Sequence, residues 1–324
     1  MADGGQTNGA GTESGAARGE GSALVLDPVD LARLASMALR ARVIVEGAFA
    51  GQHHNPHAGT SIEFAEHKEY APGDDLRHMD WKAVARVERY YIKRFEDETE
   101  MRTFLLLDGS ASMGYKRRGV SKLEYGSYLA AALGYLLAQQ GDPAGLIVFD
   151  ERTRQYLPPR TRGGHIRDLL LALEAAYAAG RTQPGRALAH AGELADRRSL
   201  IVLFTDLLDA PHGGRDDLAD RLRQLRSRGH DVALFHLLDP DEVELPVSEL
   251  DLTEFVGVEP DDTRHLLADP RDLAASFARE SLALRERWRL TCLEARVEYH
   301  FTTTATPPAE VLRQFLFSRR RGRR

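Results

Sequence analysis

Apolar and polar residues follow two patterns along this chain. Short continuous apolar runs are typical of strands buried on both faces of a sheet, and apolar residues that recur every three or four positions are typical of helices. The first pattern predicts strands at 104–108, 145–150, 199–206, 231–236 and 295–301, with an antiparallel edge strand at 154–157. The second predicts helices at 123–139, 164–179, 186–195, 216–228, 272–288 and 308–317.

Strand and helix alternate regularly from residue 101 to residue 318. This order predicts an α/β fold with a doubly wound, mostly parallel sheet and right-handed crossovers. The alternation is interrupted at 240–269, where two short segments predict a hairpin carried outside the main sheet. Residues 319–324, Arg-Arg-Arg-Gly-Arg-Arg, are interpreted as a solvated basic tail at the end of the last helix.

The chain before residue 101 has a different character. Residues 1–22 are rich in Gly, Ala, Ser, Thr and Glu and predict a disordered tail. Residues 23–100 predict a small N-terminal α+β accessory region, with a helix that begins at Pro28, is capped by Asp27, and is expected to pack on that region. Strands are predicted at 61–70 and 90–95.

Between those strands lies the segment Gly-Asp-Asp-Leu-Arg-His-Met-Asp-Trp-Lys at 73–82, which continues with further charges to residue 86. Opposite charges set this densely beside a tryptophan more often fix an interface between substructures than perform acid–base catalysis, so we interpret the segment as structural. The nearby His53, His54 and His57 surround an Asn-Pro turn and are interpreted as loop side chains rather than metal ligands.

Composition narrows the classes of function. Lys and Arg total 43 against 49 Asp and Glu, a formal charge of -6, which argues against a protein dominated by nucleic-acid binding. Cys292 is the only cysteine, so an internal disulfide is excluded, and its apolar neighbours predict a buried, inert thiol. The sequence contains no apolar run of roughly 18 residues and no signal-like start, so we predict a cytoplasmic protein without a membrane span.

Oxygen-bearing side chains follow two of the buried strands and one loop. Asp108, Ser110 and Ser112 stand at the end of the first strand, and Asp206 ends another. Thr182 lies in the tight loop 180–185, where Gln-Pro-Gly follows it at the start of a helix. In open α/β sheets ligands bind at the carboxyl edge, where these five would converge if the two strands are neighbours. Such ligands suit Mg²⁺, or another hard cation such as Mn²⁺. Each hydroxyl or carboxylate taken alone is equally compatible with a helix N-cap.

Three segments carry a resemblance to a known site: Asp-Gly-Ser-Ala-Ser at 108–112, Gly-Arg-Thr-Gln-Pro-Gly at 180–185 and Phe-Thr-Asp at 204–206. They resemble the metal-ion-dependent adhesion site of von Willebrand factor type A domains. The resemblance implies that Ser110, Ser112 and Thr182 contact the ion directly. It implies that Asp108 and Asp206 act largely through water, and that an open coordination position accepts a carboxylate from a protein partner.

The upstream segments 63–70 and 73–86 are similar to the signature of the bacterial domain-of-unknown-function family numbered fifty-eight. Proteins of that family resemble partners of MoxR-type AAA+ ATPases. Both signatures occur in the expected order, over roughly residues 25–318. They imply a von Willebrand factor type A-like domain that acts as a non-catalytic, Mg²⁺-dependent protein-binding module, as adaptor or partner of a MoxR-type AAA+ ATPase.

A serine hydrolase is the second hypothesis. The run from Ser110 to Gly114 is one residue away from the G-x-S-x-G nucleophile elbow, and Asp206 and His236 follow Ser112 in the chain order of an α/β-hydrolase triad. The first glycine of the elbow is replaced by Ser110, so the sharp turn behind the nucleophile would have to carry a side chain. A glycine-rich Lys-Ser/Thr loop for nucleotide phosphates is absent from the sequence.

Overall fold

A computed structural model of the chain describes residues 25–50, 64–69, 91–95, 101–208, 214–247, 252–257 and 265–322. The predicted tail at 1–22, the three histidines at 53–57 and the signature segment at 73–86 lie outside the described residues.

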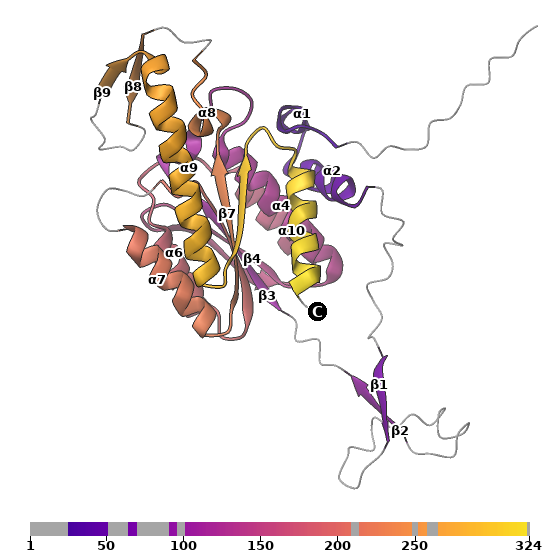
Figure 1. Cartoon of the computed structure of the whole chain (residues 1–324). Helices are drawn as coiled ribbons and strands as arrows, with labels where there is room; N and C mark the ends of the chain where they lie inside the picture. The colour runs from indigo at the N-terminus through magenta and orange to yellow at the C-terminus, as the bar shows by residue number, and fades with distance from the viewer. Residues whose placement is uncertain are drawn as a thin grey trace, which may run out of the picture.

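The centre of the structure is a six-stranded sheet in the order β10-β7-β6-β3-β4-β5 (Figure 1). All neighbouring pairs are parallel except β4 and β5, which are antiparallel. The strands are β3 (Arg102–Asp108), β4 (Ala144–Phe149), β5 (Thr153–Arg160), β6 (Ser199–Thr205), β7 (Asp231–Leu238) and β10 (Glu298–Thr303). The predicted doubly wound, mostly parallel α/β sheet with one antiparallel edge strand is therefore confirmed.

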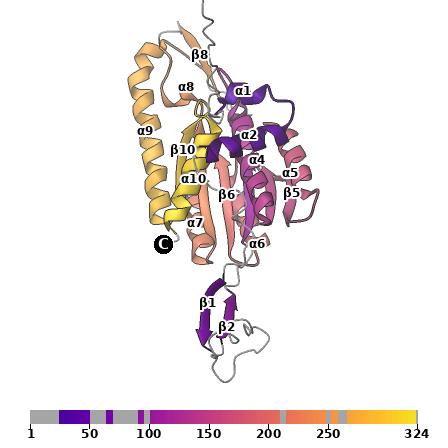
Figure 2. The same cartoon turned by 90° about the vertical axis from the view of Figure 1, so that its right-hand side faces the viewer.

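Helices cover both faces of the sheet (Figures 1 and 2). Successive residues of β3 point to opposite faces: Leu105 and Leu107 belong to one apolar core, and Phe104 and Leu106 to the other. This explains the continuous apolar run in the sequence. The first core is closed by α4 (Lys122–Gln140), α5 (His165–Glu174) and α10 (Pro308–Gly322). The second is closed by α6 (Pro184–Leu194), α7 (Gly214–Ser227) and α9 (Pro270–Glu294).

The N-terminal helical segment differs from the prediction of one helix. It forms α1 (Pro28–Ala32) and α2 (Met37–Phe49), separated by a break at which Ser36 caps α2 by accepting a hydrogen bond from the Leu39 amide at 3.3 Å. We expected this segment to pack on the accessory region. Its buried face instead joins the core under α4 and α10 through residues that include Ala41, Ile44 and Val45.

The remaining elements agree with the prediction in kind and differ in their ends. The strands predicted at 61–70 and 90–95 are β1 (Phe64–Glu69) and β2 (Tyr91–Phe95), which pair antiparallel. The predicted hairpin outside the main sheet is confirmed as β8 (Thr253–Val256) and β9 (His265–Ala268), preceded by the short helix α8 (Pro240–Val243).

Three helix ends were predicted wrongly. The helix predicted at 308–317 continues to Gly322, so residues 319–322 of the predicted basic tail belong to α10. The helix predicted at 164–179 ends at Glu174, because the following residues form a loop whose Ala179 amide donates to the Gly109 carbonyl at 2.9 Å. The helix predicted to end at 288 continues to Glu294, so the last strand begins at Glu298 rather than at 295.

Candidate functional site

The site predicted from the sequence lies where the strand order reverses. From β3 the chain proceeds to β4 on one side, and it later returns to place β6 on the other side, so the carboxyl ends of β3 and β6 flank a switch point. Open α/β sheets bind ligands at this position, outside the carboxyl ends of the strands. Asp108 ends β3 and Thr205 ends β6, with Asp206 directly after it.

Asp108 is the centre of a hydrogen-bonded cluster and is fully buried. Its Oδ2 accepts hydrogen bonds from Thr182 Oγ1 at 2.6 Å and from Thr205 Oγ1 at 2.7 Å. Its Oδ1 accepts one from the Ser110 amide at 2.9 Å. Ser110 Oγ and Ser112 Oγ lie 3.2 Å apart, and both side chains are buried. One carboxylate thus joins three segments that are distant in the sequence.

Backbone contacts fix the loop that carries Thr182. The Ala111 amide donates to the Gly180 carbonyl at 2.8 Å, and the Ala179 amide donates to the Gly109 carbonyl at 2.9 Å. Gly180 has φ +74, and a Cβ placed on it would lie 2.8 Å from Asp150 Oδ2. The loop can therefore approach the end of β4 this closely only with glycine at this position.

Arg154 holds the same loop from the edge of the sheet. Its Nε donates to Asp150 Oδ2 at 2.6 Å, its Nη1 donates to the Tyr177 carbonyl at 2.8 Å, and its Nη2 donates to the Ala179 carbonyl. The guanidinium also lies over the Tyr177 ring, 4.8 Å from the centroid. These contacts order residues 177–179 and so help to place Thr182.

Asp206 has a partner that sequence reasoning missed. Its Oδ2 accepts a hydrogen bond from Lys122 Nζ at 2.8 Å, and its Oδ1 accepts one from the Leu208 amide at 3.1 Å. Lys122 is the first residue of α4, is fully buried, and also donates to Glu242 Oε1 at 2.6 Å. Thr205 was missed as well. Its position could have identified it, because it ends a buried strand just as Asp108 does.

The acidic side chains at this edge of the sheet change the pKa values of their neighbours. Burial, together with the charge of Asp206, raises the pKa of Asp108 to about 6, although hydrogen bonds from Thr182, Thr205 and the Ser110 amide act in the opposite direction. Burial alone would lower the pKa of Lys122, but Asp206 and Glu242 together raise it above its ordinary value. A cation beside Asp108 would therefore favour its charged form.

The residues of the cluster fit a hard cation. The five predicted ligands, Asp108, Ser110, Ser112, Thr182 and Asp206, supply only oxygen, which Mg²⁺ and Mn²⁺ accept and which zinc and copper sites seldom use alone. Across the described ranges, no group of three or more His, Cys, Asp or Glu is placed to hold a metal ion. An ion at this edge would therefore depend on hydroxyl ligands, as the sequence pattern predicts.

The hydrolase alternative finds no support in the contacts. His236 Nδ1 lies 2.7 Å from the Tyr299 hydroxyl, and burial lowers the pKa of His236 to about 4. Ser112 pairs with Ser110, and the Asp206 carboxylate pairs with Lys122. Within the described residues the His236 side chain makes no hydrogen bond to Ser112 or to the Asp206 carboxylate, so a Ser-His-Asp relay is not formed.

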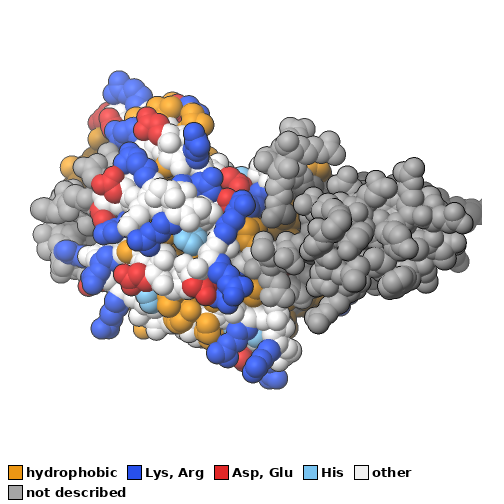
Figure 3. All heavy atoms as spheres, turned by 90° about the horizontal axis from the view of Figure 1, so that it is seen from below, with side chains coloured by type: hydrophobic (Ala, Val, Ile, Leu, Met, Phe, Trp, Pro, Cys, Tyr) orange, Lys and Arg blue, Asp and Glu red, His pale blue; other side chains and the backbone are white. Residues whose placement is uncertain are grey.

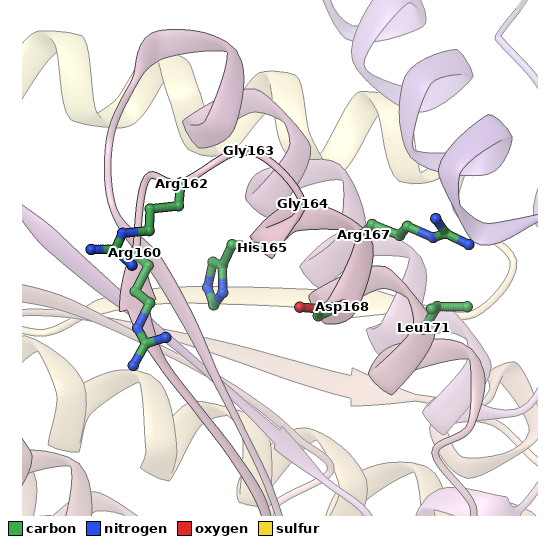
Figure 4. Close-up of a pocket in the computed structure, with 8 residues that line it drawn as sticks. All are labelled: Arg160, Arg162, Gly163, Gly164, His165, Arg167, Asp168 and Leu171. Atoms are coloured by element: carbon green, nitrogen blue, oxygen red, sulfur yellow. The ribbon is translucent and has the colours of Figure 1, made fainter.

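A cavity of about 560 Å³ lies at the opposite edge of the sheet, at the start of α5 (Figure 4). It is lined by Arg160, Arg162, Gly163, Gly164, His165, Arg167, Asp168 and Leu171. Its mainly cationic lining does not match a cation site. Seen from below, Lys and Arg side chains are spread over the described surface with acidic side chains between them (Figure 3).

Comparisons with solved structures give similarities of low score. The chain is similar to BatB from Bacteroides thetaiotaomicron, with a TM-score of 0.46 and 16% identity over 68% of this chain and 99% of that one. For the VWA domain of SpRpn10 the TM-score is 0.37, with 10% identity over 65% and 93% of the two chains. For the manganese-loaded TRAP protein of Plasmodium vivax it is 0.32, with 19% identity over 42% and 56%. The order of strands in the sheet therefore defines the fold.

No helix among the described segments is long and apolar enough to cross a membrane.

In sequence, the chain is 28% identical over 270 residues to the uncharacterized proteins Mb1516 of Mycobacterium bovis and Rv1480 of Mycobacterium tuberculosis. The match covers 80% of this chain and 80% of each relative. The model of the family described as "Protein of unknown function DUF58" matches residues 66–287. The chain therefore belongs to the DUF58 family, as the resemblance of its sequence implied.

Proposed function

We propose that this chain is a non-catalytic protein-binding module that holds Mg²⁺ or Mn²⁺ beside Asp108 and uses the ion to bind an acidic side chain of a protein partner. The observation that carries the proposal is the cluster around Asp108, where hydroxyls from two other segments meet one buried carboxylate. A carboxylate with a pKa raised to about 6 by burial and by a neighbouring acid favours a cation at its side.

Each of the five predicted ligands has a distinct part in this proposal. The hydroxyl oxygens of Ser110, Ser112 and Thr182 would hold the ion, and Asp108 and Asp206 would balance its charge, largely through water. Thr182 donates its proton to Asp108, so the lone pairs of its oxygen stay available to a cation. When bound, the ion supplies a positive centre to which a carboxylate of another protein can bind.

The partner in this proposal is a MoxR-type AAA+ ATPase, with this chain as its adaptor in the cytoplasm. That part rests on the resemblance of the segments 63–70 and 73–86 to the family signature. The partner's ATP cycle would do the work, because the described contacts of this chain include no catalytic relay.

Ion binding is tested first, on the full chain with Mg²⁺ and Mn²⁺ as probes in isothermal titration calorimetry. Ser112→Ala should abolish or strongly weaken binding of both ions, because it removes one hydroxyl ligand and leaves the hydrogen bonds of Asp108 in place. Ser127→Ala, at a buried serine of α4 outside the cluster, is the matched control and should bind like the wild type. Equal ion affinity in the Ser112→Ala variant would overturn the metal assignment.

Partner binding is tested next, by pull-down of a purified MoxR-type AAA+ ATPase with the full chain. Capture should require Mg²⁺ and should be lost with EDTA or in the Ser112→Ala variant. Asp108→Ala should also abolish capture, but it leaves two hydroxyls and one amide without their acceptor, so its fold must be checked by circular dichroism. Capture that persists in EDTA would remove the adhesion-type mechanism.

A further inference from the structure

The most unusual group near the site is the buried lysine. Lys122 has a fully buried side chain, and its ammonium donates to Asp206 Oδ2 at 2.8 Å and to Glu242 Oε1 at 2.6 Å. A buried lysine is costly unless paired, and here two carboxylates from different elements share one ammonium. The lysine therefore joins the start of α4, the end of β6 and the helix α8.

We propose that Lys122 is an internal counter-cation of the site, which balances the charge of Asp206 when no divalent ion is bound and thereby weakens the affinity of the site for that ion. The inference rests on the proposed function and deepens it, because it assigns a regulatory role to a residue outside the ligand set. Lys122 acts through Asp206 and is a positioning residue.

The charges give the direction of the effect. Without Lys122, the buried carboxylate of Asp206 would have no cationic partner among the described residues, and a bound divalent cation would compensate its charge most strongly. With Lys122 in place that need is already met, and a divalent ion held near Asp206 is repelled by the ammonium. The structure thus stabilises the metal-free site at the expense of metal affinity.

Glu242 tunes this balance because it competes with Asp206 for the same ammonium. Its position is fixed by α8: its Oε2 accepts from the Asp239 amide at 2.7 Å, and its carbonyl accepts from Ser281 Oγ at 2.9 Å. Removal of the Glu242 charge would leave Lys122 to Asp206 alone and strengthen that pair. Removal of the Lys122 charge should therefore tighten ion binding, and removal of the Glu242 charge should weaken it.

A weakened site has a functional consequence. If the free protein binds the ion only weakly, occupancy becomes substantial when a partner carboxylate adds its own charge at the open coordination position. Ion and partner then raise each other's affinity by the same factor, as linkage requires. The module would bind its partner and its ion together.

The test measures ion affinity and metal-free stability in the full chain, with Mg²⁺ and Mn²⁺ as probes. Lys122→Met should lower the melting temperature without metal, because the buried carboxylate of Asp206 and the partly buried carboxylate of Glu242 lose their partner. It should also tighten ion binding by about tenfold or more. Glu242→Gln should weaken ion binding several-fold. Lys122→Arg keeps the charge and should restore an affinity close to that of the wild type.

A purely structural role for Lys122 predicts a different pattern, in which damage to the fold weakens ion binding in Lys122→Met as well as in Glu242→Gln. If the wild type binds the ions and Lys122→Met binds them equally or more weakly, this inference fails and the proposed function stands. If neither protein binds them, the proposed function fails as well. Should Lys122→Met not fold, Glu242→Gln decides through two measurements: weaker ion binding together with a metal-free melting temperature like that of the wild type supports the inference, and any other result overturns it.

Discussion

Thr182 Oγ1 donates a hydrogen bond of 2.6 Å to Asp108 Oδ2, between residues 74 positions apart in the chain. The bond has two consequences. It stabilises the fold by tying the loop before α6 to the end of β3. It also orients the threonine hydroxyl so that its proton points to Asp108 and its lone pairs remain for a cation.

Thr182→Val should separate these two consequences, because valine keeps nearly the volume of threonine and loses the hydroxyl. We expect the free energy of unfolding to fall by about 1–3 kcal/mol, since a buried carboxylate loses one donor. We also expect the stabilisation by millimolar Mg²⁺ to disappear, because ligand binding stabilises only a fold that binds the ligand. Urea denaturation with and without MgCl₂ measures both, with Thr182→Ser as the variant that keeps the hydroxyl. Full Mg²⁺ stabilisation in the valine variant would exclude Thr182 as a ligand.

Gly180→Ala tests whether the loop must approach Asp150 as closely as it does. The matched control is Gly141→Ala, because Gly141 has a similar φ of +79 and a Cβ placed there would meet nothing within 4 Å. The control should cost about 1–2 kcal/mol for the left-handed backbone alone. Gly180→Ala should cost clearly more and weaken Mg²⁺ binding, because its Cβ would lie 2.8 Å from Asp150 Oδ2 and displace Thr182. Equal costs in thermal or urea unfolding would show that the close approach is unimportant.

The sequence was sufficient for the central sheet because its strands carry a distinctive signal. Leu105 and Leu106 face different cores and are both fully buried, so the strand reads as a continuous apolar run that ends abruptly in Asp108. Parallel strands bring such ends to one edge, and Thr182 reaches the same carboxylate from its loop. The pattern thus predicted the fold and brought Asp108 and Thr182 to one place, but it did not point to Thr205, whose hydroxyl binds the same carboxylate.

The partners of Lys122 could not be found in this way. Asp206 and Glu242 lie 84 and 120 positions away from it, and a lysine at the start of a helix resembles any surface lysine in sequence. Its burial follows only from the packing of α4 and α8 around the end of β6. Similarly, the apolar face of α2 was evident from its spacing, but the surface that it covers depends on tertiary packing.

Ile44→Ala tests that packing. Ile44 is 1% exposed in the core shared with α4, whereas Leu39 on the same helix is 41% exposed. We expect Ile44→Ala to lower the free energy of unfolding by about 2–4 kcal/mol, and Leu39→Ala to change it by less than about 1 kcal/mol. Denaturant unfolding of the full chain measures both. If Ile44→Ala is as mild as the control, the packing of Ile44 on α4 contributes little to the stability of the domain.

His236 should make stability depend on pH in a defined window. Burial lowers its pKa from 6.5 to about 4, so between these values the unfolded chain binds a proton that the folded chain does not. Stability contributed by the neutral imidazole is therefore present above pH 6.5 and is lost as the pH falls towards 4. One such proton corresponds to a slope of about 1.4 kcal/mol per pH unit.

His236→Asn should remove this slope, and asparagine can keep a hydrogen bond to the Tyr299 hydroxyl. The packing cost of the substitution is measured separately at pH 7.5, where the histidine is neutral in both states. Parallel curves for wild type and variant between pH 4 and 6.5, measured by urea unfolding, would mean that His236 titrates equally in both states.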